Sequence, residues 1–309
     1  MSSVIVSANP GAGVCTLAKQ AANNLLDLNR ETFRARFDRE PFIIGHHLED
    51  HPLFTLPRLV ELSRRLPKEN VKYNAGNIPI GIELYTGPQT GLSAEETIRR
   101  IEECGSWMVL KWVEQDDEYR DLLNRCLDEV QALSEPIVPG MSKREAFIFV
   151  TSPRSITPYH MDPEYSFLLQ IRGRKTVKVM PGSAVSEQEL EDYFGGGCDP
   201  AFKEECKETA PTFRLTPGKG LHFPITVPHW VENGDEVSIS FSITFRTLAS
   251  ERKSIVYDMN RRLRMRGLNP APYGRSALRD SAKFYAFRAA RRARKLLGLK
   301  EQKAEGGRQ

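Results

Sequence analysis

Two histidines and a carboxylate are the residues of this chain whose types and spacing point most directly to metal chemistry. His160 and Asp162 stand two residues apart in the segment TPYHMD, and His229 follows in the segment PHW. Two imidazoles and one carboxylate form the ligand set that holds non-haem Fe(II) on one side and leaves positions open for a co-substrate and oxygen. The three residues therefore predict an oxygen-activating iron site.

A His-x-Asp/Glu triplet is weak evidence by itself. With 6 His and 40 Asp+Glu among 309 residues, composition predicts roughly one such triplet by chance. A second triplet, His47-Leu48-Glu49, does occur, in a polar run that also contains His46 and His51. We interpret that run as a solvated connection. Support for His160 must come from the segments around it.

Three segments near the motif have the composition and period of β-strands. Residues 145–150 are rich in β-branched and aromatic side chains, and residues 167–180 predict two strands joined as a hairpin at 172–174. Residues 236–245 alternate strictly between apolar and mainly hydroxyl side chains. Residues i and i+2 of a strand face the same way, so His160 and Asp162 can share one ion. A barrel of antiparallel strands would bring His229 to them.

Lys175 lies on the apolar face of its predicted strand, in phase with Val177 and Val179. A lysine that points inward is costly unless it meets an anion. It either extends to solvent at the strand end or binds a carboxylate, where a charge-assisted hydrogen bond would contribute about 1.5–3 kcal/mol. The second alternative fits the distal carboxylate of 2-oxoglutarate.

Together these motifs resemble the JmjC-type, cupin-like Fe(II)/2-oxoglutarate oxygenases. That family shows Thr-Pro-x-His-x-Asp, then Gln-Ile-x-Gly-x-Lys, then a late His before an alternating strand, as residues 157–162, 170–175 and 228–230 do here. Residues 145–247 are similar in particular to the branch with the asparaginyl hydroxylase that inhibits hypoxia-inducible factor. The resemblance implies a mainly β fold with flanking helices, built on a double-stranded β-helix (jelly-roll, cupin-like) core.

The resemblance also implies roles for individual residues. It implies that His160, Asp162 and His229 bind iron, and that Lys175 and Thr157 hold the C5 carboxylate of 2-oxoglutarate.

Two positions depart from the family pattern, and one further histidine is an alternative candidate for the third metal ligand. Ser166 and Ser242 stand where the asparaginyl hydroxylase places Asn side chains near the co-substrate, which leaves the substrate open. His222 is a rival third ligand, but His229 is preferred because it immediately precedes the alternating strand. We expect His222 to line the barrel or lie at the surface.

The chain divides into three expected regions. Residues 1–140 should form a mostly helical region that flanks the barrel, residues 141–250 the catalytic barrel, and residues 251–309 a basic helical region. Within the first region we expect helices over 55–66, 93–104 and 117–133, and a strand or helix start at 107–113.

The third region differs in charge from the rest of the chain. From residue 251 onward there are 17 Lys+Arg and 5 Asp+Glu, a formal net charge of +12, whereas the whole chain carries +4. A helix predicted over 275–299 has an apolar stripe among its arginines. That stripe either packs on the barrel or on a second subunit of a homodimer, or the helix docks an acidic partner.

Other sequence features bear on the compartment. The chain has no run of 18 apolar residues and no secretory signal pattern, and its five cysteines form no Cys-x-x-Cys pair. We therefore expect free thiols, no membrane span and a cytoplasmic location.

The sequence thus predicts a dioxygenase that converts 2-oxoglutarate to succinate and CO2 while it hydroxylates a C–H bond of a protein or peptide side chain. A hydroxylase of a small molecule or a carrier-tethered amino acid in secondary metabolism is the first alternative. A cupin-like binding protein without turnover is the second, and the intact ligand set with Lys175 argues against it.

Overall fold

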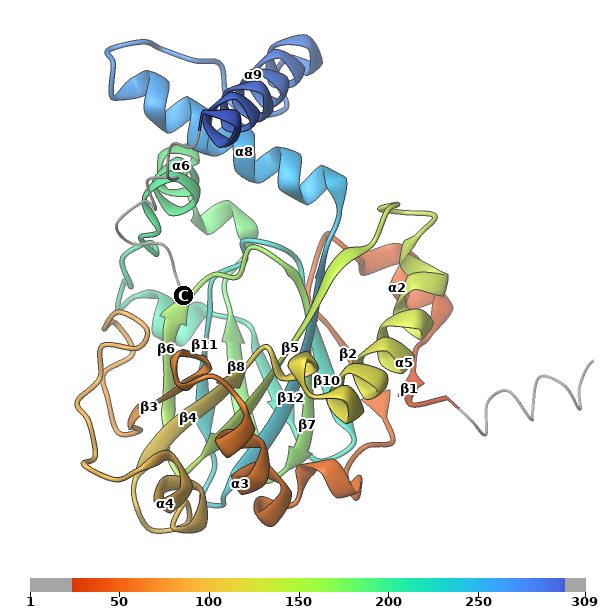
Figure 1. The fold of residues 1–309 in the computed structure, drawn as a ribbon, viewed down its shortest axis with the longest axis vertical. Coiled ribbons are helices and arrows are strands. Elements are labelled where there is room, and N and C mark those ends of the chain that lie inside the picture. Colours follow the sequence, from red (N-terminus) through yellow and green to blue (C-terminus); the bar gives the residue numbers. More distant parts are fainter. Residues whose placement is uncertain (1–23, 298–309) are drawn as a thin grey trace, which may run out of the picture.

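The computed structural model describes residues 24–297 and shows two antiparallel β-sheets with helices around them (Figure 1). The strands are β1 (Leu26–Asp27), β2 (Phe42–His46), β3 (Val71–Ala75), β4 (Ser106–Lys111), β5 (Ser142–Thr151), β6 (Ile156–His160), β7 (Tyr165–Arg172), β8 (Lys175–Val179), β9 (Thr212–Leu215), β10 (Lys219–Phe223), β11 (His229–Asn233) and β12 (Ser238–Arg246). The α-helices are α2 (Arg30–Arg36), α3 (Leu56–Arg65), α4 (Ala94–Arg99), α5 (Asp117–Ser134), α6 (Glu187–Gly196), α7 (Cys206–Thr209), α8 (Leu248–Arg264) and α9 (Ala277–Leu296).

Strands β5 to β12 form a double-stranded β-helix. Their order is β10-β7-β12-β5 within the larger sheet and β6-β11-β8-β9 in the smaller one. Apart from the step from β8 to β9, the chain changes sheet at every connection, which is the winding of a jelly roll. The predicted fold class, mainly β with flanking helices and a jelly-roll core, is confirmed.

The region before residue 140 does more than flank this core. Its described part contains the predicted helices, but strands β1 and β2 extend the larger sheet beyond β10, and β4 and β3 extend it beyond β5. Residues 107–111 of the segment 107–113, whose structure the sequence left open, belong to β4 and pair with both β3 and β5. The expectation of a mostly helical accessory region therefore missed the strands that join it to the barrel.

The predicted helices of this region form with one difference in capping. Ser93 and Glu96 make the expected reciprocal capping box, although the helix ends at Arg99. Thr55 precedes α3, but its hydroxyl donates to the Pro52 carbonyl and leaves the helix without a side-chain cap. Helix α5 begins and ends within one residue of its predicted limits.

Helices α2, α3 and α5 cover the outer face of the larger sheet. The apolar side chains of β12, from Ile239 to Phe245, pack in one cluster with apolar residues of these helices. The hydroxyl side chains of β12 point the other way, into the space between the sheets. The alternation predicted for this strand is therefore correct, and the polar face is the one that lines the barrel interior.

The predicted hairpin at residues 172–174 is wrong. Strand β7 pairs with β10 and β12 in the larger sheet, whereas β8 pairs with β9 and β11 in the smaller one. The tight turn carries the chain from one sheet to the other. Gly173 has a φ of +73°, and a Cβ there would lie 2.3 Å from the Val237 carbonyl oxygen, so the crossing requires glycine.

Helix α8 follows directly from β12 and packs against α6, and α9 packs on α8 at the end of the molecule beyond the barrel (Figure 1). Asp280 and Phe284 of α9 are buried, while Leu278, Tyr285 and Leu296 on its opposite face are 85%, 66% and 82% exposed. The apolar stripe of this helix thus faces away from the barrel, because α9 packs on α8 through another face. Among residues 24–297, no helix is both long and apolar enough to cross a membrane.

Candidate metal centre

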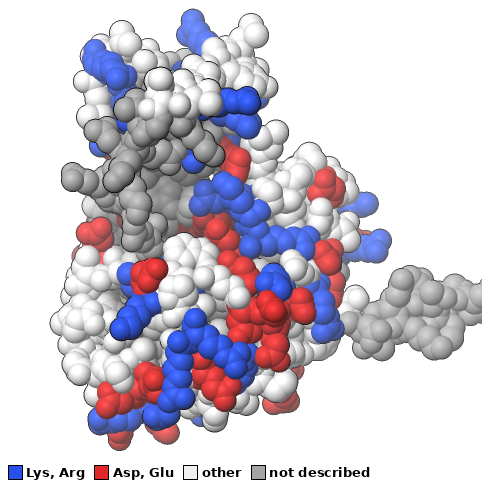
Figure 2. Space-filling view, viewed as in Figure 1, with Lys and Arg blue, Asp and Glu red and all other residues white. Residues whose placement is uncertain are grey.

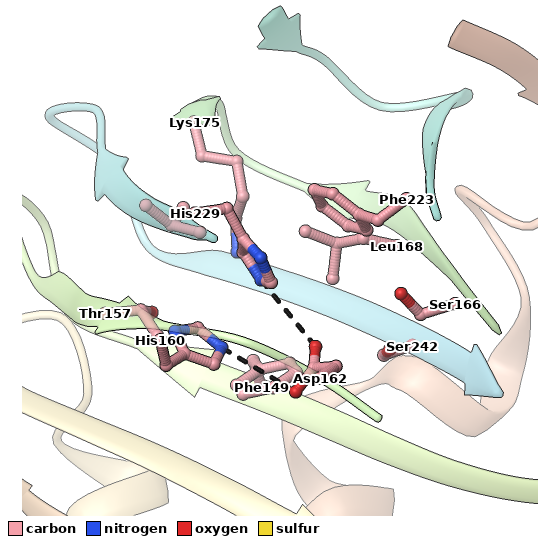
Figure 3. A pocket seen from close by; sticks show the side chains of 11 residues that line it. Phe149, Thr157, His160, Asp162, Ser166, Leu168, Lys175, Phe223, His229 and Ser242 are labelled. Atoms are coloured by element: carbon pink, nitrogen blue, oxygen red, sulfur yellow. Dashed lines mark ion pairs between the residues drawn. The ribbon is translucent and has the colours of Figure 1, made fainter. Parts of the chain in front are cut away.

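His160, Asp162 and His229 come together at one end of the smaller sheet, as Figure 3 shows. The Nε2 atoms of His160 and His229 lie 4.0 and 3.7 Å from the two carboxylate oxygens of Asp162. Two atoms that bind one ion at about 2.1 Å each lie at most about 4.2 Å apart. The three side chains are therefore spaced to share an ion, and no other group of this kind occurs among the residues described.

Backbone carbonyls fix the orientation of both imidazole rings. His160 Nδ1 lies 2.7 Å from the Pro158 carbonyl oxygen, and His229 Nδ1 lies 3.0 Å from that of Val227. A carbonyl oxygen only accepts, so each Nδ1 carries the proton and each Nε2 carries the lone pair that a metal takes. Phe223 stacks on the face of the His229 ring, with ring centroids 4.4 Å apart, and restricts its movement.

An irregularity in strand β6 brings Thr157 to the same side as His160. His160 pairs with His229, but Thr157 pairs with Val231, so three steps along β6 match two along β11. Such a bulge inserts one residue and reverses the side that the next residues face. Without it, side chains three residues apart would point to opposite sides of the sheet. Period-two reasoning does not predict this bulge.

All seven residues predicted for the site line one cavity between the sheets, with about 390 Å³ of space including solvent at its mouth (Figure 3). They are Thr157, His160, Asp162, Ser166, Lys175, His229 and Ser242. Sequence reasoning missed the apolar part of the wall, which consists of Phe149, Leu168, Phe223 and Val231. The signal for Leu168 was its phase, because it stands two residues from Ser166 on the same strand.

Lys175 is 5% exposed and points into this cavity. Burial lowers the pKa of its ammonium group from 10.5 to about 7. No carboxylate within residues 24–297 forms an ion pair with it. A buried lysine without a counter-charge is unfavourable in the empty protein, so the cavity favours an anionic ligand.

Two hydroxyl groups add hydrogen-bonding capacity to the cavity. Thr157 Oγ1 accepts a hydrogen bond of 2.8 Å from the indole N–H of Trp107. Ser166 Oγ is buried without a partner among the described groups. A buried hydroxyl left unpaired is costly, so Ser166 is also placed to bind a ligand.

A buried network of hydrogen bonds around Gln170 supports the turn that precedes Lys175. Gln170 Nε2 donates to the carbonyls of Arg172 and Gly173 and to Ser238 Oγ, and Ser240 donates to Gln170 Oε1. This network fixes the turn from which β8 begins, and thereby the place where Lys175 enters the cavity.

The other histidines of interest lie elsewhere. His222 is fully buried, but it stacks with Phe37 and Phe167 on the helix side of the larger sheet, away from the metal cluster. It neither lines the barrel nor reaches the surface, and burial lowers its pKa to about 3. His46, expected in a solvated connection, is instead buried at the end of β2, whereas His47 and Glu49 are exposed.

A wider cleft opens outside the metal cluster, with about 960 Å³ of space including solvent. Its wall includes Tyr85, Trp107, Trp112, Phe147 and Phe149, and it shares Thr157, His160, Asp162 and Ser242 with the inner cavity. Charged groups lie at its edge, where Glu164 pairs with Arg246. Burial raises the pKa of Glu164 to about 7 against the opposing effect of Arg246. The metal cluster therefore lies between a small inner cavity and a large outer cleft.

Comparison with known proteins gives distant structural likenesses. No protein-family model matches the sequence, and no curated protein does. The ribosomal oxygenase YcfD from Escherichia coli is 17% identical with a TM-score of 0.49, over 86% of this chain and 67% of that one. YcfD in complex with cobalt and 2-oxoglutarate is 15% identical with a TM-score of 0.46 over the same shares. The DMSP lyase DddQ from Ruegeria pomeroyi is 15% identical with a TM-score of 0.24, over 34% of this chain and 39% of that one. At these values the likenesses do not establish an activity for this chain.

Proposed function

We propose that this protein is an Fe(II)/2-oxoglutarate-dependent dioxygenase. The observation that carries the proposal is the joint presence, in one cavity, of a two-histidine, one-carboxylate cluster and a buried lysine without a counter-charge. A metal site alone fits many proteins. A metal site with a cationic anchor for an anion fits a co-substrate that binds at both ends.

His160, Asp162 and His229 would hold the metal. Both imidazoles present Nε2, the third ligand is a carboxylate oxygen, and there is no thiolate in the cluster, which suits Fe(II) of the facial-triad type. Bound Fe(II) would supply oxygen activation coupled to loss of CO2 from the co-substrate. The carbonyl partners of the two Nδ1 atoms keep both ligands in the required tautomer.

Lys175 and Thr157 would bind the C5 carboxylate of 2-oxoglutarate. Lys175 supplies a charge, Thr157 supplies a hydroxyl proton, and the buried hydroxyl of Ser166, with Ser242 nearby, offers further hydrogen bonds. The apolar wall of Phe149, Leu168 and Val231 keeps water out, which strengthens the electrostatic attraction between Lys175 and the carboxylate.

The overall reaction balances as R–H + 2-oxoglutarate + O2 giving R–OH + succinate + CO2. We propose that the carbon to be hydroxylated belongs to a side chain of a protein or peptide. The support is the outer cleft, which is wide, partly aromatic and open to the metal cluster through shared residues.

We also propose that α9 docks an acidic partner. Its outward stripe of Leu278, Tyr285 and Leu296 is bordered by Arg288 and Arg292, which are exposed. In Figure 2 the end of the molecule formed by α8 and α9 shows mainly Lys and Arg among its charged groups. A second copy of the chain would bring like charges together, so charge favours an acidic partner over a homodimer.

A cytoplasmic location remains part of the proposal. The four cysteines in the described part of the chain, Cys104, Cys126, Cys198 and Cys206, are free thiols, which fits a reducing compartment.

Anaerobic titration of Fe(II) and 2-oxoglutarate tests the central proposal. The wild type should develop the weak visible charge-transfer band of the chelate. Asp162→Ala should abolish the band, and Lys175→Ala should weaken 2-oxoglutarate binding by tenfold or more, since a hydrogen bond to a charged group contributes about 1.5–3 kcal/mol.

Lys178→Ala is the matched control, because Lys178 is on the other face of the same strand and donates to the Lys207 carbonyl. Its binding should equal that of the wild type. A folded, iron-loaded wild type without the band would exclude the oxygenase and leave a binding protein.

A further inference from the structure

Trp107 connects the two spaces on either side of the metal cluster. It belongs to β4, a strand from the region that the sequence placed outside the barrel, and it is 1% exposed. Its ring lines the outer cleft, while its indole nitrogen reaches Thr157, which lines the inner cavity.

We infer that Trp107 is a positioning residue for the co-substrate: its indole N–H holds the Thr157 hydroxyl so that the hydroxyl proton is presented to the carboxylate beside Lys175. The inference rests on the proposed function. It adds a residue from outside the jelly-roll core to the co-substrate site, through a contact with Thr157 rather than with the ligand.

The direction of the hydrogen bond supports this role. An indole N–H only donates, so Thr157 Oγ1 is the acceptor in the 2.8 Å contact. The threonine hydroxyl then has one proton left to donate, and no described group accepts it. An anion in the cavity is the partner that remains. A hydroxyl that already accepts one hydrogen bond is polarised and donates the next more strongly.

The packing of Trp107 keeps the indole in place. Its ring contacts Tyr85 and Phe149, with centroids 5.7 and 5.9 Å away. Its backbone pairs with Asn74 on one side and Thr151 on the other. The nitrogen is therefore fixed by a sheet and two aromatic rings before any ligand binds, which is preorganisation in the usual sense.

A double-mutant cycle measures the effect of the indole separately from its bulk. Trp107→Phe keeps an aromatic ring but loses the N–H, and Thr157→Val keeps the shape but loses the hydroxyl. The readout is the dissociation constant of 2-oxoglutarate, measured by anaerobic calorimetry on the full chain loaded with Mn(II), so turnover is not required.

Thr157→Val should weaken 2-oxoglutarate binding about tenfold or more, and Trp107→Phe about three- to tenfold. The double variant should bind as weakly as Thr157→Val alone, because the indole acts only through the hydroxyl. Thr157→Ser, which retains a hydroxyl, should restore near-wild-type binding and should lose it again when combined with Trp107→Phe.

Trp230→Phe is the matched control. Trp230 is fully buried and donates its indole N–H to Glu232, outside the cavity, so this variant loses an equivalent hydrogen bond without touching Thr157. Its 2-oxoglutarate affinity should stay within about twofold of the wild type.

The two ways to fail are distinguishable. A Mn(II)-loaded wild type that does not bind 2-oxoglutarate overturns the proposed function. A wild type that binds, with Trp107→Phe binding equally well or with effects that add in the double variant, overturns the role of Trp107 alone.

Discussion

At the residue scale, burial alone does not distinguish a functional side chain from a structural one. Lys175 and His222 are both buried, and burial depresses the pKa of each. His222 is surrounded by aromatic rings, whereas Lys175 faces a cavity that holds hydroxyl groups and the metal cluster. The two residues differ in what their polar atoms face: the Lys175 ammonium group faces a cavity that a ligand can enter, and the His222 ring faces closely packed side chains.

The pKa of Lys175 leads to a prediction about pH. With a pKa of about 7, the lysine is largely neutral in the empty protein above pH 7, and an anion binds its charged form. Binding must then take up a proton, so 2-oxoglutarate affinity should fall between pH 7 and pH 9, by up to about tenfold per pH unit. Calorimetry in buffers of different ionisation enthalpy would measure the proton uptake at pH 8.

The stability of the empty protein should change in the opposite sense. The unfolded lysine has its ordinary pKa of 10.5, so between pH 7 and 10.5 the unfolded state binds more protons and the free energy of unfolding rises with pH. Lys175→Met should reduce that rise and remove the pH dependence of binding. If Lys175→Met leaves both pH profiles unchanged, the lysine is not the titrating group.

The seven residues that line the cavity were expected mainly from the resemblance to the oxygenase family, while side-chain phase along the strands supported His160, Asp162 and Lys175 independently. The sequence could not predict that Thr157 and His160 share a side, since that depends on a one-residue bulge set by pairing with β11. It also missed Trp107, because a contact between residues 107 and 157 depends on which strand pairs with β5.

At the element scale, the two faces of β12 have separate tasks. Its apolar face packs against the helices outside the larger sheet. Its hydroxyl face has small side chains and therefore leaves space for the cavity inside the barrel. The alternation was evident in the sequence, but which face turned inward was not. Likewise the sequence predicted a turn at 172–174 correctly, but turn residues do not specify whether the next strand stays in the same sheet.

The crossing turn gives a prediction about stability. Gly173→Ala should destabilise the protein by at least about 2 kcal/mol, because the new methyl group would overlap the Val237 carbonyl oxygen and the φ of +73° is unfavourable for alanine. Urea denaturation would measure the change.

Gly140→Ala supplies the comparison, since Gly140 also has a positive φ, of +80°, but has open space around it. It should cost only about 1 kcal/mol. Equal losses for the two variants would mean that the steric contact at the crossing has no energetic importance.

At the scale of the whole molecule, charge and position separate the C-terminal helices from the barrel. Most of the basic residues that the sequence assigned to this region, 12 of 17, are on α8 and α9, and α9 turns its apolar stripe outward. The helical spacing of the apolar residues predicted the helix and its stripe, but the direction of the stripe depends on how α9 packs against α8.

The acidic-partner proposal predicts salt-sensitive binding at this surface. A synthetic acidic helix with a leucine stripe should bind the full chain at low ionic strength and dissociate as salt rises, because screening shortens the reach of the arginine charges. Arg288→Glu combined with Arg292→Glu should abolish binding, as fluorescence anisotropy would show.

Arg34→Glu combined with Arg39→Glu changes the same number of exposed charges on and beside α2 and should leave binding intact. Self-association of the wild type in sedimentation velocity, lost in the Arg288/Arg292 variant, would contradict the acidic partner and favour a homodimer.

The candidate metal ligands and the wall of the outer cleft come from different segments of the chain, which has a consequence for how the substrate could change. His160 is in β6, Asp162 follows two residues after that strand, and Lys175 and His229 are in β8 and β11. Most of the aromatic wall of the outer cleft instead comes from residues 84–112. If the proposed function is correct, exchange of that upstream segment should change the substrate that the cleft accepts while the candidate metal ligands stay the same. Trp107 limits the exchange, because one indole of the transplanted segment must still meet Thr157.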